Sequence, residues 1–396
     1  MPAPIRLFNA MPDALALACF SLDEESLFKA ARKHTGLSDF GDEDFLAPFR
    51  LLLEDLQASE NFTAWGRLTA RMILLQELQS RLCVEDRMRQ HPDILAENVR
   101  SPVIIAGLPR TGTTHLHNLL SEVGGLRFMP MWQTLEPVQN PRQKTDRRRR
   151  TNDIAMTMAN YICPLVHRMQ KMETDLPFEE LTICALCYRS FAFESAFRVP
   201  HYRAWYAKAD HTSGYLYLKK ILQLLQAEGS MPGKPAGSHW VLKSPQHVDQ
   251  LPAIVRAFPD AKIVLTHRDP VRAVLSMVTM MLYVSRMLYT PDRRHAEAKA
   301  WVDRLEQMLR DSREQVRHLP KGQVIDVHFD EFMKEPQRTI EQVLAFANVE
   351  FDDKSRQAIT EHLQHNIRYR YGRIDYCFED IGISEGELKE RFSFYT

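Results

Sequence analysis

The sequence has no uninterrupted apolar run of the length that a membrane-spanning helix needs. Apolar stretches such as 72–75 and 274–284 are interrupted by charges or fall well short of the roughly 20 residues that a membrane-spanning helix needs. The first ten residues contain one Arg, two Pro and no compact apolar segment. We therefore expect no membrane span and no secretion signal, and we expect a cytoplasmic location.

Cysteine is scarce, and its spacing excludes two common uses. Six cysteines are scattered over 396 residues, which is typical of reduced core thiols and not of a disulfide framework. Cys184 and Cys187 form a C-x-x-C pair, but neither a second pair nor a His cluster accompanies them. We therefore expect no metal site.

An excess of either charge is also missing, because 51 Lys and Arg residues balance 51 Asp and Glu residues. No overall field favours nucleic acid, so any anion must be held by a local site. One pronounced charge block runs from Arg147 to Arg150. A solvated helix start is its simplest interpretation, and contact with an anionic acceptor or a partner is the alternative. A homodimer stays open as well.

Apolar spacing divides the chain into a helical and a mixed part. With 44% hydrophobic residues the chain can bury a large core. Helical spacing without a convincing strand predicts a helical N-terminal region over 1–100. Short apolar runs at 103–106, 240–242, 263–266 and 324–327 predict buried strands, and helical patterns follow them. We predict an α/β domain over 101–396 with a P-loop-type parallel sheet flanked by helices, and a helical cap insertion over 150–230 on the acceptor side.

The segment 107–114, Gly-Leu-Pro-Arg-Thr-Gly-Thr-Thr, joins the first predicted strand to an apolar-periodic helix. Two glycines at such a junction let backbone N–H groups curl around a phosphate at the positive end of the helix. Thr113 stands where nucleoside triphosphatases need a Lys, so the loop suits ATP with magnesium poorly. A glycine turn with Thr helix caps is the alternative. We predict an anion site formed by Arg110, Thr111, Gly112, Thr113 and Thr114.

Two later strands also end in residues that bind anions. Lys243 follows the strand at 240–242, at the carboxyl end where α/β sheets bind ligands. Arg268 follows the strand at 263–266, and Ser276 lies two helical turns further on. A planar guanidinium and a hydroxyl can share one anion. We predict that Arg268 and Ser276 do so.

These segments resemble a known family. The loop 107–114 resembles the 5′-phosphosulfate-binding loop of sulfotransferases that use 3′-phosphoadenosine 5′-phosphosulfate (PAPS), closest to bacterial proteins related to tyrosylprotein sulfotransferases. Arg268 with Ser276 resembles their 3′-phosphate site, and 242–245 resembles the segment whose Lys contacts the sulfate. The segments 371–373 and 378–382 resemble the C-terminal block, where Arg373 adds a second cation. The resemblance implies PAPS as cofactor, no metal, and sulfuryl transfer to a hydroxyl or amine.

Sulfuryl transfer needs cations for the departing charge and a base for the acceptor proton. We expect Arg110 and Lys243 to supply the charge. In many relatives a Glu follows the position of Trp132, where this chain has Gln133, so another residue must be the base. We rank Glu180 first and Glu179 second, because neighbours on a helix point about 100° apart and only one can face the crevice. Helix-start carboxylates are the alternative, and the weaker candidates for the base are His247, His117 and His115.

The acceptor is not determined by the sequence. Aromatic and Met-rich stretches at 188–205 and 277–287 make a hydrophobic small molecule one interpretation, although such residues are more often core. Two alternative functions stay open: a P-loop small-molecule kinase, which would depend on magnesium, and a non-catalytic nucleotide-binding module that lost its base at Gln133.

Overall fold

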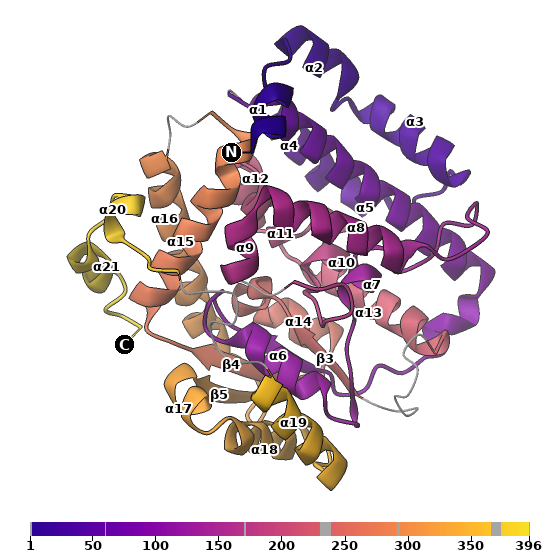
Figure 1. Cartoon of the computed structure of the whole chain (residues 1–396). Coiled ribbons are helices and arrows are strands. Elements are labelled where there is room, and N and C mark those ends of the chain that lie inside the picture. Colours follow the sequence, from indigo (N-terminus) through magenta and orange to yellow (C-terminus); the bar gives the residue numbers. More distant parts are fainter. Residues whose placement is uncertain are drawn as a thin grey trace.

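A parallel sheet forms the centre of the molecule. The computed structural model describes residues 2–59, 61–169, 172–229, 239–290, 294–365 and 374–395. The strands are β1 (Val103–Ala106), β2 (Leu126–Arg127), β3 (His239–Lys243), β4 (Lys262–His267) and β5 (Val324–His328). They pair in the order β2-β3-β1-β4-β5, always in parallel (Figure 1). The predicted α/β fold is confirmed, and β2 is a strand that the sequence analysis did not predict.

Both faces of the sheet are covered. Ile104 and Ala106 of β1 pack into the larger apolar cluster, whereas Val103 and Ile105 pack into a smaller cluster on the opposite face. The smaller cluster is completed by residues of α6 (Thr113–Ser121), α17 (Phe329–Lys334), α18 (Pro336–Ala347) and α19 (Asp353–His365). In Figure 1, α17, α18 and α19 lie together below the sheet. Burial on both faces explains why the strands read as continuous apolar runs.

The N-terminal helices pack into the larger cluster. They are α1 (Ala3–Phe8), α2 (Asp13–Cys19), α3 (Glu24–Thr35), α4 (Leu46–Gln57) and α5 (Ala64–Gln90), with short 3-10 turns at Glu43–Phe45 and Pro92–Ala96. Leu74, Leu78 and Leu82 of α5 are fully buried in the same cluster as Ile104 of the central strand. The helical N-terminal region therefore shares one core with the sheet.

Helices alone connect β2 to β3 in the described residues. These are α7 (Met131–Leu135), α8 (Arg148–Ile162), α9 (Pro164–Met169), α10 (Leu181–Ala185), α11 (Phe191–Ala196), α12 (Pro200–Tyr206) and α13 (Thr212–Ala227). The buried aromatic residues of 188–206, such as Tyr202 and Tyr206, lie in the larger cluster. They are core residues, as the more common interpretation of such a stretch predicts.

The remaining helices follow β3, β4 and β5. They are the 3-10 turn η3 (Pro245–Asp249), α14 (Leu251–Ala257), α15 (Pro270–Leu288), α16 (Arg294–Val316), α20 (Phe378–Ile381) and α21 (Glu385–Arg391). Within the described residues, α15 is the one helix that is long and apolar enough to cross a membrane, but 61% of its apolar window is buried inside the protein. It packs against α5 and α16 and is a core helix of the fold.

Candidate active site at the carboxyl edge of the sheet

The loop between β1 and α6 adopts the tight curve that the glycines predicted. Gly112 has a φ of 88°, and Arg110, although not a glycine, has a φ of 74°. Such angles are uncommon for residues with a side chain, so surrounding contacts must hold Arg110 in this conformation. A Cβ atom on Gly107 would lie 2.0 Å from the Thr266 hydroxyl. The close approach of β4 therefore requires glycine at this position.

Three threonines follow the curve and face different partners. The Thr111 hydroxyl lies 2.7 Å from the Leu108 carbonyl and 2.7 Å from the Thr266 hydroxyl, so it ties the loop to β4. Thr113 is buried at the first position of α6. Thr114 accepts a hydrogen bond from the Lys243 ammonium (3.3 Å). The loop is thus joined to both neighbours of β1.

Arg110 and Arg268, the two arginines of the predicted donor site, contact each other through the Arg110 backbone. The Arg110 guanidinium donates to Ser276 Oγ (3.1 Å) and to the Met169 carbonyl (2.5 Å), which ends α9. Arg268 donates to the Arg110 carbonyl (2.6 Å), and its guanidinium lies 4.2 Å from the centre of the Phe329 ring. These contacts link the ends of β1, β4 and β5. They also explain how the uncommon backbone angle of Arg110 is maintained.

Lys243 extends from the end of β3 toward the same loop. Its ammonium forms an ion pair with Glu179 in addition to its bond to Thr114. The Lys243 side chain is 3% exposed and the Glu179 side chain 16% exposed. A cation and a carboxylate therefore lie beside the loop that follows β1, and the glutamate side chain is partly exposed.

Glu180, next in the sequence, points into the protein and is fully buried. Its Oε2 accepts a hydrogen bond from the Lys243 backbone N–H (2.7 Å) and lies 3.4 Å from His247 Nε2. The Tyr215 hydroxyl lies 2.8 Å from His247 Nδ1, which completes a buried chain of three side chains. Burial raises the pKa of Glu180 well above its usual range, and burial together with the nearby Lys243 charge lowers the pKa of His247 to about 3. The His247 imidazole is therefore neutral near pH 7.

Gln133, the residue that departs from the resemblance, is buried on α7, and its Oε1 is without a hydrogen-bond partner in the described residues. The start of α7 is bonded to the segment before Glu179, because Met131 N–H donates to the Leu176 carbonyl (3.1 Å). Burial raises the pKa of Glu136, at the other end of α7. Gln133 therefore lies on a helix that adjoins the segment carrying Glu179.

The histidines considered as bases are poorly suited to collect a proton. Burial lowers the pKa of His117 to about 3 and that of His115 to about 4. His117 is fully buried against the Val241 carbonyl.

Arg373, the predicted second cation at the 3′-phosphate, lies outside the described residues. Within those residues no group of three His, Cys, Asp or Glu could hold a metal ion.

The sequence did not identify several residues that the structure brings to this edge. They are the Met169 carbonyl, Thr266, Phe329 and Tyr215. Each reaches the edge through tertiary packing, from elements far away in the sequence. Of these four, only Thr266 could have been found from the sequence, because it ends a predicted strand two residues before Arg268.

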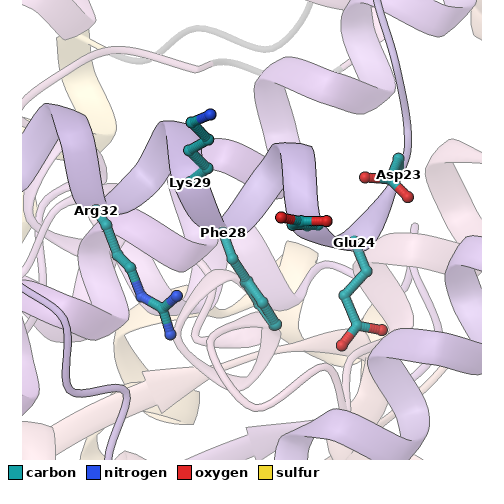
Figure 2. A pocket seen from close by; sticks show the side chains of 6 residues that line it. Asp23, Glu24, Phe28, Lys29 and Arg32 are labelled. Carbon is teal, nitrogen blue, oxygen red and sulfur yellow. The ribbon is translucent and has the colours of Figure 1, made fainter.

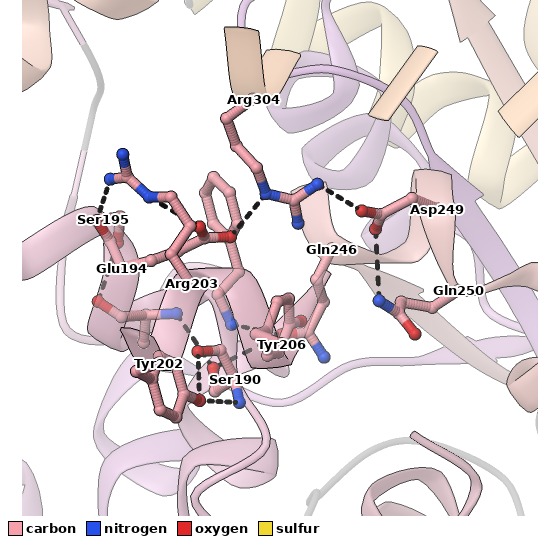
Figure 3. A network of polar contacts seen from close by, with 12 residues as sticks. Ser190, Glu194, Ser195, Tyr202, Arg203, Tyr206, Gln246, Asp249, Gln250 and Arg304 are labelled. Carbon is pink, nitrogen blue, oxygen red and sulfur yellow. Dashed lines mark hydrogen bonds and ion pairs between the residues drawn. The ribbon is translucent and has the colours of Figure 1, made fainter. Parts of the chain in front are cut away.

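A second charged cluster lies just beyond Lys243 along the chain. Arg304 of α16 donates to Glu194 (2.9 Å) and pairs with Asp249 (2.8 Å), as Figure 3 shows. Arg203 donates to the other oxygen of Glu194 (3.1 Å). The side chains of Arg304, Glu194 and Asp249 are no more than 3% exposed. This cluster joins α11 and α12, which precede β3, to η3 and α16, which follow β3 and β4.

Two surface hollows lie away from the sheet edge. One of ≈ 620 Å³ is lined by α3 and its preceding residue, including Phe28, Lys29 and Arg32 (Figure 2). Its walls come from one surface helix, so it encloses little. The other, of ≈ 190 Å³, lies among α11, α12, α15 and α16 beside Tyr289 and Trp301. Neither contains a residue of the predicted donor site.

Comparisons with known proteins show the family and the fold of the chain. A family model described as the sulfotransferase family matches residues 102–353. The crystal structure of sulfotransferase STF1 from Mycobacterium tuberculosis H37Rv is similar with a TM-score of 0.81 and 26% identity, over 94% of this chain and 98% of that chain. Sulfotransferase STF9 from Mycobacterium avium shares the fold with a TM-score of 0.82 and 23% identity, over 94% and 95% of the two chains. A search of curated proteins finds no match.

Proposed function

This chain belongs to the sulfotransferase family, and we propose that it transfers a sulfuryl group from PAPS to a hydroxyl or amine of a small-molecule acceptor in the cytoplasm. The observation that carries the proposal is the meeting of three strand ends at one loop. Lys243 after β3 and Arg268 after β4 both contact the loop that follows β1. Carboxyl ends of parallel strands are where such sheets bind nucleotides.

In this proposal the loop residues Arg110, Thr111, Gly112, Thr113 and Thr114 bind the 5′-phosphosulfate through backbone N–H groups, hydroxyls and one guanidinium. Arg268 and Ser276 bind the 3′-phosphate. Their connection through Arg110 supports a shared anion site, because Arg110 bonds to Ser276 with its side chain and to Arg268 with its carbonyl. Arg373 is proposed as a third residue that binds the 3′-phosphate, and this assignment rests on the family resemblance alone.

Lys243 and Arg110 are the proposed electrostatic groups. Negative charge grows on the leaving oxygen during in-line transfer, and cations held in place beforehand stabilise it without reorganising. The Lys243 ammonium is held by Glu179 and Thr114, and the Arg110 guanidinium by Ser276 and Met169. Their fixed positions support this role.

The burial of the two glutamates favours Glu179 as the base over Glu180, the reverse of the order that the sequence suggested. Glu179 is partly exposed and pairs with Lys243, which also contacts Thr114 of the loop. Glu180 is fully buried and its pKa is raised by that burial. We propose Glu180 as a positioning residue that holds the Lys243 backbone. Since Glu179 and Met169 both belong to the segment 150–230, we place the acceptor on that side.

The alternative functions are less well supported. A kinase needs a Lys after Gly112, where Thr113 begins α6, and acidic ligands for magnesium beside the loop. A module that only binds a nucleotide would not need a lysine held in place by a partly exposed glutamate, as Lys243 is by Glu179. The ion pair of Lys243 with Glu179 favours an enzyme.

Calorimetric titration tests the donor assignment. The purified full chain is titrated with 3′-phosphoadenosine 5′-phosphate and, separately, with ATP and magnesium. We expect micromolar or tighter binding of the first compound and little response to the second. A preference for ATP that depends on magnesium would replace this proposal with the kinase, and binding of the first compound without turnover on an acceptor panel would favour the non-catalytic module.

A further inference from the structure

Helix α8 presents an exposed apolar stripe whose position no packing partner explains. Ile154, Met158 and Tyr161 are 55%, 55% and 72% exposed. They are three of the nine large apolar side chains that are exposed in the described residues, and no other described helix carries more than two. Large apolar side chains that gather on one exposed face indicate an interaction surface.

Basic residues extend this stripe toward the start of the helix. At about 100° per residue, Arg147, Arg150, Ile154, Met158 and Tyr161 fall within an arc of about 80° on one face. Arg147 and Arg150 are exposed, and neither forms an ion pair in the described part of the chain. The neighbours in the same run are engaged elsewhere, Arg148 with Asp146 and Arg149 with Asp175.

The location of these cations is unfavourable for the helix itself. The N-terminus of an α-helix carries partial positive charge, so arginines there stabilise the helix less than acidic residues would. α8 begins at Arg148 and has no acidic residue in its first turn. An external anion that meets Arg147 and Arg150 would offset this cost. The charge therefore points to an anionic partner at this end.

The opposite face of α8 is the one that packs. Asn152 is buried on that face, and the helix contacts α7 and α9. Cys163, just after α8, contacts Met287 at the end of α15 (3.5 Å). In Figure 1, α8 lies apart from α17, α18 and α19, which are at the bottom of the view. The stripe is thus on a firmly anchored helix with its apolar side outward.

We propose that this stripe, Arg147, Arg150, Ile154, Met158 and Tyr161, is a peripheral docking surface for a membrane that contains anionic phospholipids. Arginines meet the headgroup phosphates while the three apolar side chains enter the boundary between headgroups and acyl chains, as on other interfacial helices. The stripe covers about 21 Å along the helix axis, so it suits a flat contact and not a span. The proposal does not rest on the identity of the donor.

Co-sedimentation with vesicles tests the surface, with the full chain and no nucleotide present. Vesicles of phosphatidylcholine containing phosphatidylglycerol are compared with vesicles of phosphatidylcholine alone. We expect binding to the anionic vesicles and weaker binding to the neutral ones. The triple variant Ile154→Ser, Met158→Ser, Tyr161→Ser should bind the anionic vesicles at least about tenfold more weakly, because apolar area is lost.

Two further variants keep the test sharp. Leu95→Ser with Leu216→Ser removes side chains of similar exposure, 53% and 50%, from the 3-10 turn after α5 and from α13, and should leave binding within about twofold. Arg147→Ala with Arg150→Ala should weaken binding to anionic vesicles about fivefold for each charge and leave neutral vesicles unaffected. All variants should bind 3′-phosphoadenosine 5′-phosphate like the unmodified chain, which separates this test from the donor assignment.

The proposal is overturned if the unmodified chain binds neither kind of vesicle, or if both stripe variants bind as the unmodified chain does. Light scattering after gel filtration gives the remaining outcome. A dimer that the triple variant converts to a monomer, without vesicle binding, would make the stripe a contact between two copies of this chain instead.

Discussion

Two clusters of buried charge each include one residue at or just after the end of β3, Lys243 in the first and Asp249 in the second. In the first, Lys243 pairs with Glu179 and reaches Thr114 of the loop. In the second, Arg304 pairs with Glu194 and Asp249. The two cations are equally hidden, since both side chains are 3% exposed.

The partners of the cations, and not the cations themselves, distinguish the clusters. Glu179 is 16% exposed and Thr114 belongs to the anion-binding type of loop, whereas Glu194 and Asp249 are sealed in the core. Burial raises the pKa of Glu194, yet the neighbouring arginines oppose this effect and hold it as an ion pair. A buried charge cluster is therefore a candidate for chemistry when one member opens onto a ligand-binding edge.

The largest effect should follow from removing the cation of the core cluster. Arg304→Met leaves two buried carboxylates without their shared partner, which should lower the free energy of unfolding by about 3–5 kcal/mol. Urea denaturation measures this change. Arg310, on the same helix, is half-exposed and pairs with Glu306. Arg310→Met breaks this ion pair and should change stability by no more than about 0.5 kcal/mol. Equal losses in both variants would remove the distinction between the clusters.

Removing the cation at the sheet edge should instead mainly affect the rate. Lys243→Met should lower kcat about 100-fold to 1000-fold, because one preorganised charge is lost from the transition state. Its stability should fall less than that of Arg304→Met. Lys262→Met is the control: Lys262 begins β4, at the end of the sheet opposite to the carboxyl ends of the strands, and its loss should leave activity unchanged. Loss of stability without a specific loss of rate would place Lys243 with the structural cluster.

The adjacent glutamates give a smaller and more local comparison. Glu179→Gln should lower kcat about 100-fold, as expected for loss of a general base. Glu180→Gln keeps an oxygen that can accept from the Lys243 N–H and should cost less than about tenfold. Steady-state rates across pH, with one acceptor, measure both. The reverse order would restore Glu180 as the base.

The smallest effect should appear in the pH dependence of stability. Burial lowers the pKa of His247 to about 3 from 6.5, so its contribution to stability is present above pH 6.5 and is lost as pH falls toward the folded pKa. The advantage of the unmodified chain over His247→Gln should shrink by up to about 1.4 kcal/mol per pH unit below that point. His318→Gln, an exposed histidine, is the control. A constant difference between pH 7 and 5 would contradict the buried neutral imidazole.

Much of the fold was predictable because buried parallel strands leave continuous apolar runs. The run 103–106 coincides with β1, and the other three predicted strands match β3, β4 and β5 to within one residue at each end. β2 was missed because two residues carry no pattern. The helical pattern predicted after the strand at 240–242 is divided into η3 and α14, since Pro252 lacks the N–H that a continuous helix needs.

The site was only partly predictable for a related reason. Strand-end residues such as Lys243 and Arg268 could be found because topology alone brings them to one edge. The difference between Glu179 and Glu180 could not, because it depends on which side chain the Lys243 backbone captures. The contact of Met169 with Arg110 also depends on how α9 packs, and no local sequence pattern predicts that packing.

The most direct test of the donor site measures one contact with two nucleotides. Arg268→Ala is titrated with 3′-phosphoadenosine 5′-phosphate and with its analogue that lacks the 3′-phosphate, beside Arg272→Ala, an exposed arginine of the same region, as the control. The account predicts that Arg268→Ala weakens binding of the first nucleotide about 10-fold to 100-fold and leaves binding of the second nearly unchanged. Equal losses for both nucleotides would contradict the assignment of Arg268 to the 3′-phosphate.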